Sequence, residues 1–131
     1  MDFTQKQKVE MFDFLLYFEQ NIRNNKNRYS LSNNSLQDFI KRNKIMIKRL
    51  TQDNKGKIKN NPFILCCWGN DRAYDLLRHI RNSIAHGNAK IKSTKRVEIH
   101  DYDRNGNETL YGKIRFDLLM SLIKEIIKTS K

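Results

Sequence analysis

The sequence predicts a mainly α fold, a four-helix bundle with a β-hairpin inserted before the last helix. Apolar residues recur at helical spacing in four segments, whereas two short segments near the C-terminal end alternate apolar and polar residues around an Asn-Gly pair. The 131 residues are enough for one hydrophobic core and too few for two. We therefore expect residues 1–131 to form a single domain.

Two amphipathic helices are expected in the N-terminal half. The first covers residues 4–24, and its apolar face is formed by Phe12, Leu15, Leu16, Phe18 and Ile22. Ser and Asn residues at positions 32–35 can cap a second helix, which we expect over residues 36–54. Segment 55–62 should be a loop because it holds Gly, Asn and the single proline, and the short apolar segment 63–68 follows it.

The last third of the chain predicts a hairpin and a final helix. Residues 96–102 and 109–115 alternate apolar and polar side chains, and Asn105-Gly106 suits the turn between them. Because a lone hairpin is marginally stable in water, it is expected to pack on a helix or on another copy of the chain. The final helix carries one apolar stripe, formed by Phe116, Leu119, Leu122, Ile123, Ile126 and Ile127.

The charge favours a nucleic-acid partner. The chain has 26 Lys and Arg against 14 Asp and Glu, a net charge of +12, which attracts phosphate polymers more than it favours membranes or acidic proteins. A genome rich in A and T would also raise Lys and Asn content without any role in binding. The apolar stretch 11–18 contains Asp13 and follows Glu10, so it resembles neither a signal peptide nor a membrane span, and we expect a cytoplasmic protein.

The two cysteines, Cys66 and Cys67, are adjacent. They lack the spacing of redox or zinc motifs and cannot easily bridge each other, so we expect buried thiols. No Gly-rich phosphate loop and no zinc-type spacing occurs, and we expect no cofactor or metal. The segment Asp101-x-Asp103-x-Asn105-Gly106 resembles half of a calcium loop, but the position for its bidentate carboxylate is Gly112, so a turn is expected there.

The third helix has an unusual polar face. It is expected to begin at Asn70 or Asp71 and to end at His86, with Gly87 as the stop. Its core face holds Ala73, Leu76, Leu77, Ile80 and Ile84, and a polar sector of roughly 100° opposite holds Asp75, Arg78, His79, Asn82 and His86. Singly, Asp75 and Arg78 could be solvated, His79 could contact the hairpin and His86 could be a helix-terminal cation. Together they favour a functional surface.

The residues Arg81-Asn82-Ser83-Ile84-Ala85-His86 resemble the R-x4-6-H signature, with Asn after the Arg, of the HEPN superfamily of small helical proteins. Gly87 and the surrounding phrase Leu-Arg-His-Ile-Arg-Asn-Ser-Ile-Ala-His-Gly strengthen the resemblance, as does the order of helices over most of the chain. The hairpin resembles an insertion in some bacterial branches, and its role is left open.

The resemblance implies a metal-independent endoribonuclease, often a toxin or antiviral effector, in which two copies of the motif form one site. Arg81 and His86 would be catalytic and Asn82 would position them, while we expect His79 and Arg78 to support the site or contact RNA. RNA cleavage without metal needs a base for the ribose 2′-OH, an acid for the leaving 5′-oxygen and positive charge at the phosphorus. Arg81 lies about 140° around the helix from His86, so one chain offers an incomplete site and a homodimer is expected.

Two alternatives remain open at this point. The first is a dimeric HEPN-like module without catalysis, which would bind RNA, a nucleotide or a protein. The second is a toxin whose site is covered by a cognate antitoxin protein.

Overall fold

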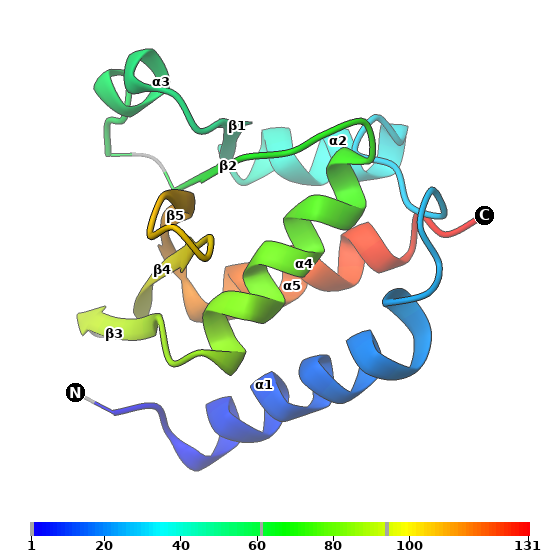
Figure 1. Cartoon of the computed structure of the whole chain (residues 1–131), viewed down its shortest axis with the longest axis horizontal. Coiled ribbons are helices and arrows are strands. Elements are labelled where there is room, and N and C mark those ends of the chain that lie inside the picture. The colour runs from blue at the N-terminus through cyan, green and yellow to red at the C-terminus, as the bar shows by residue number, and fades with distance from the viewer. Residues whose placement is uncertain (1, 61, 94) are drawn as a thin grey trace.

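The computed structural model describes residues 2–60, 62–93 and 95–131 (Figure 1). In this part of the chain the helices are α1 Gln5–Tyr17, α2 Asn34–Arg42, α3 Gln52–Gly56, α4 Arg72–Ala85 and α5 Phe116–Ile127, and a π-helical turn, η1 Phe18–Ile22, continues α1. The strands are β1 Met46–Arg49, β2 Phe63–Cys66, β3 Ala89–Ser93, β4 Arg96–Tyr102 and β5 Glu108–Arg115.

The five strands form one mixed sheet in the order β1-β2-β5-β4-β3. Strands β1 and β2 are parallel, and the other neighbouring pairs are antiparallel. Helix α4 packs against β4 and β5, α5 packs against β5 and α2, and α1 lies along α4 (Figure 1). The hydrophobic core therefore lies between one face of the sheet and a layer of helices.

The mainly α prediction is wrong, because the protein has an α/β fold with a five-stranded sheet. The second helix predicted over residues 36–54 stops at Arg42, Lys44 adopts a positive φ of 53°, and β1 follows. The apolar segment 63–68 contains β2, whose residues are all buried. A strand covered on both faces shows no alternation, so its sequence cannot be told from a helix segment by periodicity.

The predicted hairpin is confirmed, but it lies inside the sheet. Strands β4 and β5 pair antiparallel, and the Asp103 carboxylate accepts hydrogen bonds from the N–H groups of Asn105 and Asn107 in the turn. Gly106 has a φ of +81°, which glycine adopts without strain. The loop predicted over residues 55–62 includes Asn61, which lies outside the described residues; its first part belongs to α3.

Cys66 is buried and Cys67 is half-buried, and both are free thiols. Burial raises the pKa of each thiol. Within the described ranges, none of the helices combines the length and apolar character that a membrane crossing requires.

Candidate functional site

Helix α4 carries the candidate site, and both of its ends follow from local sequence. The Asp71 carboxylate caps the N-terminus by accepting a hydrogen bond from the Tyr74 N–H, 3.2 Å away. At the other end the Asn88 N–H donates to the Ser83 carbonyl at 2.8 Å, and Gly87 has a φ of +75°. This pairing with a left-handed glycine is a Schellman closure. The helix therefore ends at Ala85 with His86 as its C-cap residue, one residue before the end that the sequence predicted, and Gly87 is the stop.

A buried polar cluster joins α4 to β4. His79 is 6% exposed and Asp101 3%, and the His79 Nδ1 lies 2.8 Å from the Asp101 Oδ2. The Asn82 amide donates to the same oxygen at 3.4 Å. Burial opposes ionisation of Asp101, but the hydrogen bonds from His79 and Asn82 and the attraction of His79 hold the pKa of this carboxyl below its usual value. His79 therefore contacts the hairpin, one of the roles considered for it, and fixes α4 on the sheet.

Arg78 extends this cluster toward the surface. Its guanidinium lies 3.4 Å from the Asp75 carboxylate and 3.3 Å from the His79 Nε2. Because a guanidinium only donates hydrogen bonds, the His79 Nε2 accepts and its Nδ1 donates to Asp101. Arg78 thus orients one tautomer of the buried imidazole, while its own side chain is 41% exposed.

Arg81 is turned toward the N-terminal helix. Its Nη1 donates to the Asn82 side-chain oxygen at 3.0 Å, and its Nη2 lies 3.1 Å from the Glu19 carboxylate of η1. Arg23 binds the same carboxylate, and the pKa of Glu19 is lowered, first by the hydrogen bond from Arg23 and then by the attraction of both guanidiniums. The Arg81 Nε is buried without a hydrogen-bond partner in the described part of the chain. Asn82 therefore links Arg81 to Asp101, and so to the buried cluster.

His86 stands apart from these contacts. It is the C-cap residue of α4, it is exposed, and no hydrogen bond joins it to Arg81 within the described residues. The structure therefore brings Arg81, Asn82 and His79 into one connected network and leaves His86 facing solvent. The expected separation of Arg81 and His86 around the helix agrees with this arrangement.

Three apolar side chains are exposed on one side of α1. Phe12 is 67% exposed, Leu16 57% and Val9 48%, and their spacing places them on one side of the helix. We call these three residues the α1 stripe. The stripe belongs to the helix that lies along α4 and leads into Glu19, the partner of Arg81. Apolar residues grouped in this way are typical of a protein interface.

A shallow groove of about 200 Å³ begins two residues after His86. It is lined by Asn88, Lys90, Lys92, Glu98, His100 and Tyr102. The two nitrogens of His100 lie 2.9 Å from Glu108 and 2.7 Å from Glu98. The hydrogen bond from His100 and the charge of Lys113 outweigh the effect of burial and lower the pKa of Glu98.

Aromatic rings form one wall of this groove. The His100 ring stacks on Tyr102 and on Tyr111, with centroid separations of 6.0 and 4.9 Å, and Tyr102 is 46% exposed. Sequence reasoning missed this groove. Its only signal is the set of polar and aromatic residues at alternate positions of the strands, which also describes an ordinary solvent-facing sheet.

The comparison with known protein families decides the classification. Residues 7–131 match the family model described as HEPN pEK499 p136. The chain belongs to this HEPN family. No curated protein and no solved structure matches it. The match covers nearly the whole chain, strands included, so the five-stranded sheet lies within the HEPN domain.

Proposed function

We propose that this HEPN protein is a metal-independent endoribonuclease whose site is formed by two copies of the chain, acting as a toxin or antiviral effector. The observation that carries the proposal is that, within one chain, Arg81 and His86 of the motif lie apart. The sequence from Arg81 to His86 is intact, yet Arg81 binds Glu19 and Asn82 while His86 faces solvent at the C-terminal end of α4. The motif of one chain therefore supplies one imidazole, and general acid–base cleavage needs two proton-transfer groups.

A homodimer that packs through the α1 stripe would supply the missing groups. The stripe lies on the helix next to α4, so pairing two copies there can bring the two α4 ends toward one cleft. Burying Phe12, Leu16 and Val9 would remove apolar surface from water, which favours association. A second copy is therefore both the expected partner and the source of the second His86.

The reaction then follows from the residues. One His86 takes the proton of a ribose 2′-OH, and the 2′-oxygen forms a bond to the adjacent phosphorus. The partner's His86, in its protonated form, gives a proton to the 5′-oxygen as the P–O5′ bond breaks. The products are a 2′,3′-cyclic phosphate and a 5′-OH. The two Arg81 guanidiniums would stabilise the charge on the phosphorane oxygens, once phosphate replaces Glu19 as their partner.

The groove that begins at Asn88, two residues after His86, is the proposed path of the RNA strand. Lys90 and Lys92 can bind phosphates, and the exposed ring of Tyr102 offers a face on which an unpaired base can stack. His79 and Asp101 would act indirectly, by holding Asn82 and the end of α4 in place.

The test uses purified wild type, His86→Ala and Arg81→Ala with single-stranded and structured RNA in EDTA. We expect cleavage by wild type, products with 2′,3′-cyclic phosphate ends, and a loss of about 10²- to 10⁴-fold in each variant. Lys131→Ala, which changes an exposed residue distant in sequence from the motif, serves as the control. Undiminished cleavage by His86→Ala would refute the assignment.

A second function, that of a non-catalytic dimeric module for RNA, nucleotide or protein binding, is favoured by one contact. The ion pair between Arg81 and Glu19 holds the guanidinium away from His86. If this pair persists when RNA binds, Arg81 cannot reach a phosphate. RNA binding with steep salt dependence but without cleavage would support this alternative. In either case a cognate antitoxin protein remains a proposed partner.

A further inference from the structure

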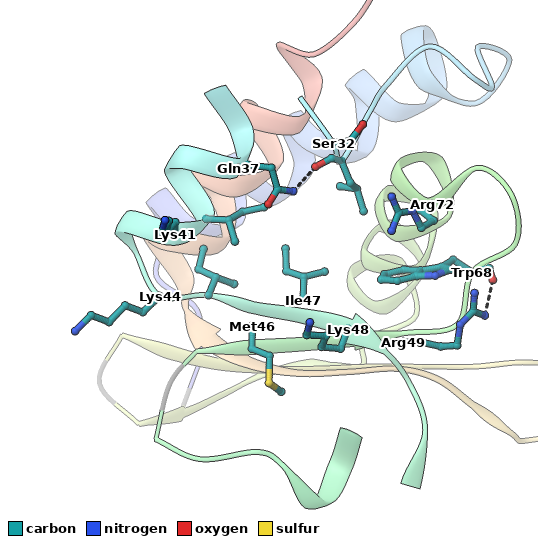
Figure 2. Close-up of a pocket in the computed structure, with 13 residues that line it drawn as sticks. Ser32, Gln37, Lys41, Lys44, Met46, Ile47, Lys48, Arg49, Trp68 and Arg72 are labelled. Atoms are coloured by element: carbon teal, nitrogen blue, oxygen red, sulfur yellow. Dashed lines mark hydrogen bonds between the residues drawn. The ribbon is translucent and has the colours of Figure 1, made fainter. Parts of the chain in front are cut away.

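A large cavity lies at the end of α4 that is remote from the motif. It has a volume of about 730 Å³, within the range of about 300–1,000 Å³ that ligand pockets occupy. Figure 2 shows it between α2, strand β1 and the segment around Trp68 that leads into α4. Arg72, the first residue of α4, lines it, whereas His86 follows the last residue of that helix. The 14 residues of α4 span about 20 Å at 1.5 Å per residue, so the two places are distinct.

The charge around this cavity has one sign. Among the described residues, its lining includes no carboxylate. It includes five exposed cations: Lys41, Lys44, Lys48, Arg49 and Arg72. Ion pairs with neighbouring carboxylates do not neutralise them in the described part of the chain. Cations gathered around one cavity repel one another, and a bound anion relieves that repulsion.

Apolar side chains form part of the lining of the cavity, and both faces of its one aromatic ring are covered. Leu31, Ile40, Ile45 and Ile47 contribute apolar side chains. The guanidiniums of Arg49 and Arg72 lie 5.8 and 5.9 Å from the centre of the Trp68 ring, and Figure 2 shows them on opposite sides of it. Arg49 also donates a hydrogen bond to the Trp68 carbonyl at 2.9 Å. A nucleobase would find no open face of Trp68 on which to stack, which disfavours a single-stranded nucleic acid here.

Strand β1 offers a backbone edge along the same cavity. It is the outermost strand of the sheet order and pairs with β2 on one side only. Its other side has no strand partner in the ranges that the structure describes, and there the Arg49 carbonyl accepts a hydrogen bond from the Asn54 side-chain amide at 2.8 Å. Four of its residues, Met46 to Arg49, line the cavity. An edge of this kind accepts an extended peptide as a further strand.

We propose that this cavity binds an extended acidic segment of a partner protein, which adds to β1 as a sixth strand. Alternate side chains of such a segment would contact the apolar part of the lining beside Ile40 and Ile47 and direct carboxylates toward the five cations. RNA would satisfy the cations but would leave the strand edge and the apolar part of the lining unused. The proposal does not depend on RNA cleavage, since a chain that cut no RNA could bind the same segment.

The experiment uses a fluorescent peptide of roughly six residues, a common strand length, that alternates Glu and Val. Binding to the full chain is followed by anisotropy at about 0.15 M salt. Lys41→Gln/Lys44→Gln removes two cavity charges and is expected to weaken binding about tenfold or more. The matched control, Arg42→Gln/Lys57→Gln, removes two exposed charges outside the cavity and should change the affinity less than about twofold.

Two further peptides test separately whether binding needs the negative charge and whether it needs pairing with β1. A Gln-Val peptide tests the charge, and an acidic peptide with proline at alternate positions keeps the charge but cannot pair with β1. Both should bind much more weakly than the Glu-Val peptide. The proposal is overturned if the Glu-Val peptide does not bind, if the two double variants weaken it equally, or if the proline peptide binds as well. It is also overturned if a single-stranded RNA of equal charge, added to the His86→Ala chain, binds more tightly at this cavity than the peptide.

Discussion

Replacing Phe12 by Ser is expected to break the proposed dimer without unfolding the chain. Full burial of a Phe side chain stabilises by about 1.5–3 kcal/mol, and Phe12 is 67% exposed in one chain. If the α1 stripe is the interface, both copies lose this burial, about 2–4 kcal/mol per dimer. Because about 1.4 kcal/mol corresponds to a factor of ten, the dimer dissociation constant should rise by roughly 30- to 1,000-fold.

Sedimentation velocity across a concentration series measures this change directly. Tyr102→Ser is the matched control, because it also removes an exposed aromatic residue, on β4 and away from α1. Circular dichroism should give the same helix content for both variants and wild type. The interface assignment is refuted if Phe12→Ser and Tyr102→Ser leave the same dissociation constant, or if wild type is monomeric at concentrations where it cuts RNA.

Three other perturbations test the remaining contacts. Glu19→Gln should free Arg81 and lower the RNA dissociation constant several-fold, measured by filter binding on the His86→Ala chain; unchanged affinity would show that the ion pair does not compete with phosphate. Asp101→Ala leaves the buried His79 without its partner and should reduce the free energy of unfolding by about 2–4 kcal/mol in urea titrations. Because the folded-state pKa of Asp101 is lowered, its stabilisation is present at neutral pH and lost as the pH falls through that folded pKa, so wild type and Asp101→Ala should converge in acid. Tyr102→Ala should weaken the binding of single-stranded RNA by roughly tenfold and leave the binding of duplex RNA unchanged. Equal losses of affinity for the two RNAs would argue against base stacking.

The helix ends and the turn that depend on residues close in sequence could be predicted from the sequence. Asp71, Gly87 and the Asn105-Gly106 turn each act through hydrogen bonds or backbone conformations within a few residues, and all lie where the sequence placed them. The apolar stripe of α5 was equally clear, because its periodicity is local.

The sheet could not be predicted, because its pairing depends on distant partners. Residues 46–49 pair in register with residues 63–66, and β2 in turn pairs with β5, which lies beyond the whole of α4 in the chain. Nothing within the segment 36–54 distinguishes a continued helix from a strand except the turn after Asn43. That turn uses a positive φ at Lys44, which a sequence pattern does not require.

The sequence predicts which residues belong to the candidate site, but it does not predict how their side chains are arranged. The helical wheel separated Arg81 from His86, which the contacts bear out, but placed His79 on a polar sector opposite the core. His79 is buried because β4 supplies Asp101 as its partner, and that partner is 22 residues away in the chain. A buried hydrogen bond of this kind is visible only once the strand is in place.

A mixed dimer tests the central claim most directly. Wild-type chain and His86→Ala chain carrying different tags are coexpressed, and the dimer that holds one of each is isolated and given RNA in EDTA. If the two His86 residues act together as base and acid, this dimer should lose nearly all activity, about 10²-fold or more. Retention of half the wild-type rate would mean that each chain cuts alone, and would contradict the composite site.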